Sequence, residues 1–271
     1  MIEDFKVDGV SLKTLAFNIE TRSGWDGLPP KRGDNQEVPY RPGQVWQPKE
    51  WDQRVLPLKM WVIGCNEDGT LPTVESRRAR YNSNLQKLRK LFATRHRELA
   101  LERTLDLPGG AVVTTGLGEV MSTMDSTTVA GATRGTFTVD MQMADPLWYG
   151  AQVTESVTSA GLTIVNVGED IAAKMTISLI GPLVYPRLKN TTNGIDVRFN
   201  GTISGGQTVV LDTDAFTALN GVTNVIGNIR HAGSPWWMKL MPGNNAMTLD
   251  NWQGGAVGAG SVSVVYKPTY L

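Results

Sequence analysis

Three Asn-Gly pairs in the second half of the chain constrain its fold more than any other feature: Asn193-Gly194, Asn200-Gly201 and Asn220-Gly221. An Asn-Gly pair between apolar segments is a strong signal for a two-residue β-hairpin, because both residues tolerate positive φ angles. Segments expected to form strands lie around these pairs, at residues 174–181, 195–199, 207–211, 222–226, 236–241, 246–252 and 261–266. Strands spaced this closely, without a helical pattern between them, predict a β-sandwich or a jelly roll.

One long helix is expected in the first half, over about residues 73–93. Apolar residues recur there at helical spacing, at Leu85, Leu88, Leu91 and Phe92. The outer face of this segment carries a row of basic residues: Arg77, Arg78, Arg80, Lys87, Arg89 and Lys90. Such a row is most often a solvated surface, but it could instead pair with acidic groups of a neighbouring chain.

The other elements predicted in the first half are strands and one long loop. Alternating leucines at 99, 101, 105 and 107 indicate a strand, and residues 54–64, 111–125 and 134–143 are also expected to form strands. Residues 24–48 hold five prolines and four glycines, which remove backbone donors or favour unusual φ angles. We expect residues 24–48 to form a surface loop or a hairpin arm, and a loop of this length is usually functional.

The distribution of charge predicts two domains of mainly β structure. Residues 1–150 contain 38 charged side chains and residues 151–271 contain 14, with both signs equal in each part. This change places a boundary near Gly150, between a first domain at 1–150 and a second at 151–271. Residues 152–160, rich in Thr and Ser, are either a linker or the first strand of the second domain.

The total charge argues against a protein dedicated to binding DNA. The chain has 26 basic and 26 acidic residues, whereas a protein that grips phosphates normally carries a basic excess. The N-terminal segment lacks the features of a secretory signal, and no apolar run is long enough to span a membrane. We therefore expect synthesis in a cytoplasm and no membrane partner.

Few side chains are available for catalysis. His96 and His231 are the only histidines, and neither lies in a motif that would place it beside a nucleophile. Cys65, the only cysteine, follows an apolar segment and is expected to be a small buried side chain that forms no disulfide within the chain. The glycines at 109, 110, 116 and 118 do not form a phosphate loop. We predict no catalytic residues, no cofactor and no enzymatic activity.

Two residue pairs could still mark binding sites. Asp212 and Asp214 would share one face of a strand and could bind Ca²⁺ or act as acid and base. No third acidic residue lies near, so hydrogen bonds in a turn are the preferred interpretation and no metal site is predicted. Trp236 and Trp237 are adjacent, so only one of their rings can face the core of a sheet. We favour subunit contact or loop packing over stacking on a sugar for the other ring.

The order of these features resembles the phage distal tail protein family, whose members are often described as minor tail proteins. Residues 137–149 close the first half with the sequence Ala-Asp-Pro-Leu-Trp-Tyr after a strand, as the ring-forming domain of the family ends. The resemblance continues in the second half at residues 166–168, 177–182, 190–194, 209–212 and 242–244.

The resemblance implies a first domain of β-sandwich or split-barrel type with one helix, and a galectin-like, jelly-roll-like second domain. It implies a structural protein of the virion, in which six copies form a ring that links the tail tube to the tip or baseplate. Its partners would be further copies of itself, the tail tube protein, the tape-measure protein and tail-tip proteins. DNA would pass through the ring without sequence-specific binding. Members of the family carry no catalytic residues, so none are expected here.

Two other functions stay open. Trp236 and Trp237 on a predicted sandwich could belong to a carbohydrate-binding module that assists host-surface recognition. A hydrolase of cell wall or capsule is the least supported, because the sequence offers no paired Glu residues and no metal-ligand cluster.

Overall fold

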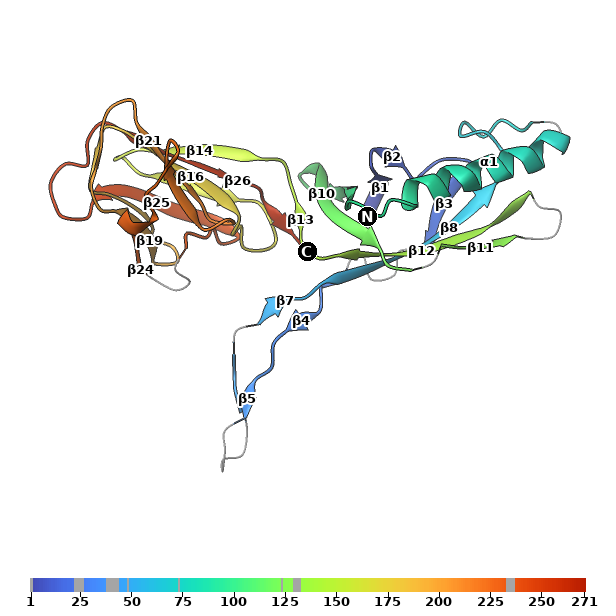
Figure 1. Ribbon diagram of the computed structural model, residues 1–271, viewed down its shortest axis with the longest axis horizontal. Coiled ribbons are helices and arrows are strands. Elements are labelled where there is room, and N and C mark those ends of the chain that lie inside the picture. The colour runs from blue at the N-terminus through green and yellow to red at the C-terminus, as the bar shows by residue number, and fades with distance from the viewer. Residues whose placement is uncertain are drawn as a thin grey trace. The chain divides into compact units, whose positions relative to one another are not determined.

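The computed structural model divides the chain into two compact units, each described here by itself (Figure 1). Unit 1 comprises Met1–Trp148 with Leu271, and unit 2 comprises Tyr149–Tyr270. The structure describes residues 2–21, 27–37, 44–47, 49–72, 74–122, 124–128, 133–232 and 237–271. Within them α1 (Val74–Phe92) is the one α-helix and strands predominate. The predicted class, mainly β with one helix, is confirmed.

The main strands of unit 1 form one sheet in the order β2-β1-β9-β10-β12-β8-β3, and β11 pairs with β12. Their bounds are β1 Ile2–Val7, β2 Val10–Ser11, β3 Phe17–Thr21, β8 Arg54–Ile63, β9 Leu99–Leu107, β10 Gly110–Val120, β11 Asp125–Thr128 and β12 Arg134–Met143. β10 connects two parts of this sheet, because residues 110–118 pair with β9 whereas Glu119 and Val120 pair with β12.

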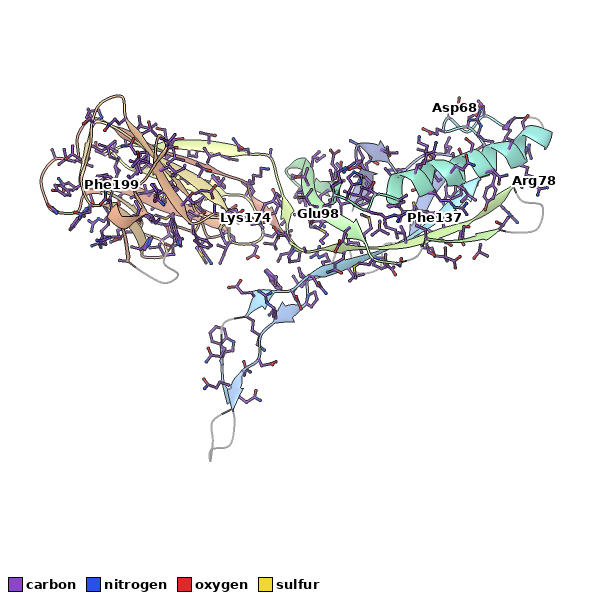
Figure 2. All side chains as sticks on the ribbon, viewed as in Figure 1. Asp68, Arg78, Glu98, Phe137, Lys174 and Phe199 are labelled. Atoms are coloured by element: carbon purple, nitrogen blue, oxygen red, sulfur yellow. The ribbon has the colours of Figure 1, made fainter. Side chains whose placement is uncertain are left out.

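The apolar face of this sheet packs against α1. Phe137, Val139 and Met141 of β12 are buried and the residues between them are not, as the period of two in a strand requires. α1 buries a stripe of side chains at Tyr81, Leu85, Leu88 and Phe92. The rings of Phe92 and Phe137 stack with centroids 5.9 Å apart, and Figure 2 shows Phe137 on the helix side of the sheet. The predicted helix and the predicted apolar face of β12 are therefore confirmed.

The described part of residues 24–48 belongs to a two-stranded hairpin. β4 (Lys31–Arg32) pairs with β7 (Glu50–Trp51), and β5 (Gln36–Glu37) pairs with β6 (Gln44–Val45), both antiparallel. The base is fixed by Arg54, whose Nη2 donates to the Gly27 carbonyl at 3.0 Å. Residues 24–26, 38–43 and 48 lie outside the described residues. We call residues 27–51 the arm.

Unit 2 is a β-sandwich. One sheet has the order β14-β26-β16-β21-β22-β23 and the other the order β15-β25-β18-β19-β24. Buried side chains of both sheets, such as Ile177 and Val264 from the first and Leu188 and Met247 from the second, form one hydrophobic core. The bounds are β13 Trp148–Tyr149, β14 Val153–Val157, β15 Leu162–Asn166, β16 Met175–Ile180, β17 Leu183–Val184, β18 Pro186–Asn190, β19 Ile195–Phe199, β20 Thr202–Ile203, β21 Thr208–Asp212, β22 Thr217–Asn220, β23 Thr223–Asn224, β24 Ile229–Ala232, β25 Gly243–Asn251, β26 Ser261–Tyr266 and β27 Thr269–Tyr270.

Two of the three Asn-Gly pairs lie where neighbouring antiparallel strands connect, but neither is the predicted two-residue turn by itself. Four residues separate the paired Asn190 and Ile195, and the two residues between the paired Asn220 and Thr223 are Gly221 and Val222. Gly194 lies between β18 and β19, and Gly221 between β22 and β23, with φ angles of 76° and 60°. The hairpin prediction is wrong for Asn200-Gly201, because β19 pairs with β18 and β24, whereas β20 pairs with β17. The chain leaves its sheet at this pair instead of turning back along it.

Three strand predictions need correction. In each case a side chain forms a hydrogen bond with a backbone group where the strand was expected to continue. The strand predicted over 111–125 ends at Val120, and Ser122 Oγ then accepts the Asp140 N–H at 2.8 Å. The strand predicted over 222–226 ends at Asn224, whose Oδ1 accepts the Ile226 N–H at 2.9 Å and starts the 3₁₀ turn η1 (Ile226–Asn228).

The strand predicted over 236–241 is wrong in the residues that the structure describes. Residues 237–241 contain only an isolated bridge between Leu240 and Ala172. The Lys239 carbonyl instead accepts the side-chain amides of Asn190 and Asn193, at 3.1 Å and 2.9 Å. Trp236 lies outside the described residues.

Replacing Phe137 with Ala should destabilise unit 1 by about 3–5 kcal/mol, because the change removes the ring that stacks on Phe92 and leaves a cavity in the core. Denaturant unfolding followed by circular dichroism measures the loss. Thr138→Ala, at the next position on the opposite face of β12, is the matched control and should change stability little. A loss for Phe137→Ala no larger than that of the control would contradict the packing of α1 on this face.

Candidate functional site

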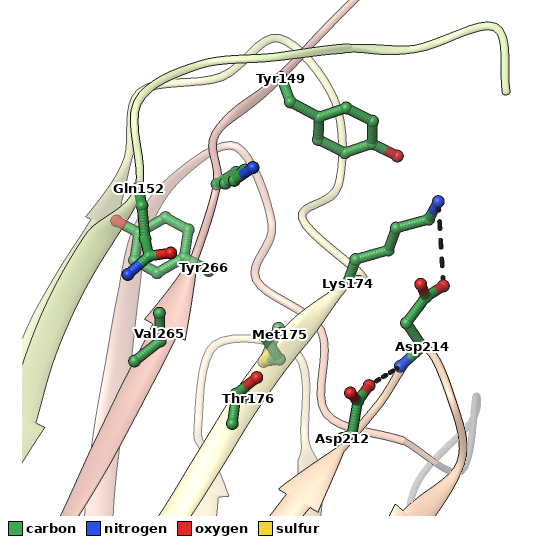
Figure 3. A pocket seen from close by; sticks show the side chains of 10 residues that line it. Tyr149, Gln152, Lys174, Met175, Thr176, Asp212, Asp214, Val265 and Tyr266 are labelled. Atoms are coloured by element: carbon green, nitrogen blue, oxygen red, sulfur yellow. Dashed lines mark hydrogen bonds and ion pairs between the residues drawn. The ribbon is translucent and has the colours of Figure 1, made fainter. Parts of the chain in front are cut away.

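Unit 2 contains an open polar pocket of about 300 Å³ (Figure 3). Its lining comes from segments far apart in the sequence, and includes Tyr149, Gln152, Lys174, Asp212, Asp214 and Tyr266. Tyr149 ends β13, Lys174 directly precedes β16, Asp212 ends β21 and Tyr266 ends β26. No local pattern in the sequence announces this site, since its members are joined only by the sandwich.

Three of the four charged side chains that line this pocket have partners within the chain. Lys174 Nζ lies 5.4 Å from the centroid of the Tyr149 ring and 3.8 Å from Asp214 Oδ1. Asp212 Oδ1 accepts the N–H groups of Asp214 and Ala215, each at 2.9 Å (Figure 3 shows the first). One of the two predicted carboxylates therefore caps a turn and the other faces a lysine, so they do not form an acid–base pair.

The histidines and the cysteine lie in separate elements. His96 is exposed in the loop after α1, whereas His231 is half-buried in β24 with its ring 4.9 Å from Trp237. Burial lowers the pKa of His231, and the nearby Asp196 carboxylate partly opposes this effect. Cys65 is buried in unit 1 and its Sγ donates to the Leu15 carbonyl at 3.0 Å. Among the residues that the structure describes, no group of three His, Cys, Asp or Glu side chains could hold a metal ion.

Two aromatic side chains meet at the surface of unit 2. Phe216 is 61% exposed with a φ of 54°, and its ring lies edge-on to Trp237 at a centroid distance of 5.5 Å. A positive φ in a bulky residue is a strained conformation. Trp237 is not in a strand, so the expectation that its ring and that of Trp236 face opposite sides of a sheet does not apply.

The outer side of α1 is strongly basic. Lys87 forms an ion pair with Glu67, and beyond the helix Arg97 Nη2 lies 2.6 Å from Asp8 Oδ2 and thereby lowers the pKa of that carboxyl. Four further basic side chains of the helix are exposed and form no ion pair with the described residues: Arg78, Arg80, Arg89 and Lys90. We call these four side chains the basic face. None of the helices in the described part of the chain has the length and apolar character needed to cross a membrane.

Comparison with known proteins relates this arrangement to phage tails. Residues 169–270 match the family model described as siphovirus-type tail component, C-terminal domain. Unit 2 is therefore similar to the C-terminal domain of siphovirus-type tail components. The resemblance to distal tail proteins seen in the sequence is thereby confirmed. No protein among the curated sequences matches this chain.

Solved structures extend the similarity to the whole chain. The crystal structure of the SPP1 Dit protein, described as a paradigm of the hub adsorption apparatus in phages that infect Gram-positive bacteria, covers 99% of each chain. It matches with a TM-score of 0.66 at 15% identity, so this chain shares its fold. Two structures of the activated phage P2 baseplate, with calcium and with strontium, give TM-scores of 0.41 and 0.40 at 9% identity. They cover 98% and 97% of each chain, with scores too low to define a common fold.

Acidification should destabilise unit 2 partly through His231. Because the pKa of His231 is lowered in the folded state, its contribution is complete above the unfolded value of about 6.5 and is lost as the pH falls below it. Between pH 7.5 and pH 5.5, the melting temperature of the wild type should therefore fall further than that of His231→Gln. His96→Gln is the control and should follow the wild type. Parallel curves for the wild type and His231→Gln would contradict the effect of burial.

Proposed function

We propose that this protein is a structural hub of a phage tail tip or baseplate, in which six copies form a ring that links the tail tube to the host-adsorption apparatus. Its partners are further copies of itself, the tail tube protein, the tape-measure protein and tail-tip proteins. DNA passes through the ring and is not bound by sequence, and the protein has no catalytic role.

The observation that carries this proposal is the fold shared with the SPP1 Dit protein over 99% of both chains. A fold alone does not define a function. The match of residues 169–270 to a family of siphovirus-type tail components is a second, independent observation that favours a phage tail protein. A hub has to make several contacts at once, and the two units supply separate surfaces for them. Unit 1 would close the ring, and unit 2 would stand at its outer side.

The arm supports the proposal because it carries surface that a single chain leaves uncovered. Its strands pair only with each other among the described residues, and an isolated two-stranded hairpin is marginally stable in water. Trp46 is 71% exposed and Leu28 is 67% exposed. Aromatic side chains are enriched at protein interfaces, and a hairpin that contains prolines loses less entropy on docking.

Purified protein should therefore assemble into six-membered rings, alone or with the tail tube protein. Native mass spectrometry gives the stoichiometry, and negative-stain electron microscopy should show six-fold particles. A chain that stays monomeric with and without the tube protein, and is missing from purified virions, would contradict the proposal.

Shortening the arm should abolish assembly without unfolding unit 1. Replacing residues 33–49 with Asn-Gly joins the paired residues Arg32 and Glu50 by the two-residue turn that suits a hairpin. The melting temperature should stay within about 4 °C of the wild type, because a shift of that size corresponds to roughly 1 kcal/mol or less. Ring particles should disappear. Trp46→Ala tests the exposed ring by itself, and Lys49→Ala is the control within the arm. Rings formed normally by the shortened chain would show that the arm is not the contact between copies.

Carbohydrate binding by unit 2 is the second candidate function, and the exposed Phe216 ring against Trp237 is the observation that favours it. Aromatic faces at a protein surface can stack on sugar rings. A glycan array probed with the full chain should show binding that Trp237→Ala removes, while Trp252→Ala, in a different aromatic pair of unit 2, keeps it. An array without bound glycans would remove this candidate and leave the hub proposal untouched.

A further inference from the structure

A groove of about 410 Å³ runs between α1 and β11 in unit 1. Arg78, Asn82 and Arg89 line it on the helix side, and Ser126 and Thr128 line it on the strand side. Figure 2 marks Arg78 near the first turn of α1. Arg78 and Arg89 are eleven positions apart, which corresponds to about 16 Å along a helix. An extended segment of about five residues has the same length.

Contacts between side chains of α1 and β11 fix the separation of the two elements along the groove. The hydroxyls of Tyr81 and Thr128 lie 3.3 Å apart, and Arg89 Nη2 donates to Ser126 Oγ at 3.2 Å. A Cβ atom at Gly135 would collide with the Tyr81 hydroxyl and with the Thr127 carbonyl. The glycine therefore permits helix and strand to approach to this fixed separation, so the groove exists before any partner binds.

One wall of the groove is a strand edge. Within the described residues β11 pairs only with β12, through the register Asp125↔Thr138 to Thr128↔Gly135. An edge strand presents backbone N–H and C=O groups that can pair with another extended chain. Addition of a strand to such an edge is a common mode of peptide recognition.

The opposite wall carries positive charge. Arg78 is exposed and forms no ion pair with any described residue. Among the described residues, the side chain of Arg89 forms a hydrogen bond only with Ser126, which is neutral. Guanidinium groups bind carboxylates with two parallel hydrogen bonds. The combination of a free strand edge and two guanidinium groups selects for a ligand that is both extended and acidic.

We propose that this groove binds an extended acidic segment of another tail protein, which adds to β11 as a strand and places its carboxylates against Arg78 and Arg89. The proposal rests on the hub function, because a hub must hold other tail proteins. A nucleic acid could meet the guanidinium groups but could not pair with the strand edge. The arm of a second copy fits less well, since the sequence of residues 27–51 has four basic residues, Lys31, Arg32, Arg41 and Lys49, against three acidic ones, Asp34, Glu37 and Glu50.

Fluorescence anisotropy with a labelled peptide of four Thr-Glu repeats tests this proposal on the full chain. The peptide should bind, its affinity should fall as salt is added, and a peptide of four Thr-Lys repeats should not bind. Arg78→Glu combined with Arg89→Glu should weaken binding at least tenfold. Arg80→Glu combined with Lys90→Glu changes the charge of the basic face equally but outside the groove lining, and should weaken binding less than threefold.

Strand addition is tested separately from charge by methylating alternate backbone nitrogens of the Thr-Glu peptide. Methylation removes donors from one edge of the peptide and keeps its charge, so one of the two alternate patterns should lose at least tenfold in affinity and the other should bind like the parent. Equal binding of both patterns and the parent would overturn strand addition.

Two further outcomes would overturn the choice of ligand. The first is absence of Thr-Glu binding at low salt. The second is tighter binding of a DNA duplex, or of a peptide with residues 27–51, that Arg78→Glu with Arg89→Glu removes. Peptide binding and ring formation are measured separately. A chain that forms rings but does not bind the peptide would contradict only the groove proposal. A chain that binds the peptide but never forms rings would contradict only the hub proposal.

Discussion

Both units depend on one constraint: a sheet with one apolar face must have that face covered. Unit 1 covers it with α1, whose Leu88 and Phe92 are buried on the side of Phe137 and Val139. Unit 2 covers it with a second sheet, so that Ile177 and Leu188 belong to one core. Burial of such faces is the dominant favourable contribution to folding. Each unit thereby has a core of its own.

The exposed surfaces of the two units differ in their chemical character. The arm exposes large apolar side chains, the outer side of α1 exposes basic ones, and unit 2 exposes an aromatic pair and a polar pocket. In that pocket Lys174 already faces Asp214 and Tyr149, so its charges are balanced within the chain. On the basic face the charges are not balanced locally, although the chain as a whole carries equal numbers of both signs. The excess of positive charge on the basic face is thus a local property of unit 1, and the total numbers of acidic and basic residues do not reveal it.

The spacing of apolar residues predicted those elements whose buried face can be recognised from residues close together in the sequence. The spacing of Leu85, Leu88 and Phe92 predicted α1, and the alternation from Phe137 to Met143 predicted β12. The same reasoning missed Arg103, which occupies a position of the leucine row in β9 and is buried. Its guanidinium lies 4.4 Å from the Trp148 ring centroid, and its Nε donates to Thr114 Oγ1 at 3.1 Å. A buried cation needs partners that only the tertiary structure supplies, just as the pocket of unit 2 and the free edge of β11 arise from segments distant in sequence.

The position of Cys65 has a practical consequence for handling this protein. The chain has a single thiol, which is buried against the Leu15 carbonyl, and burial raises its pKa. The thiolate is the reactive form of cysteine, so this residue is poorly suited to oxidation or to cross-linking between copies. We therefore expect no disulfide between copies of this chain. A cysteine introduced on the surface would be the one readily alkylated group, which allows a fluorophore or spin label to be attached at a chosen position while the native residue stays in place.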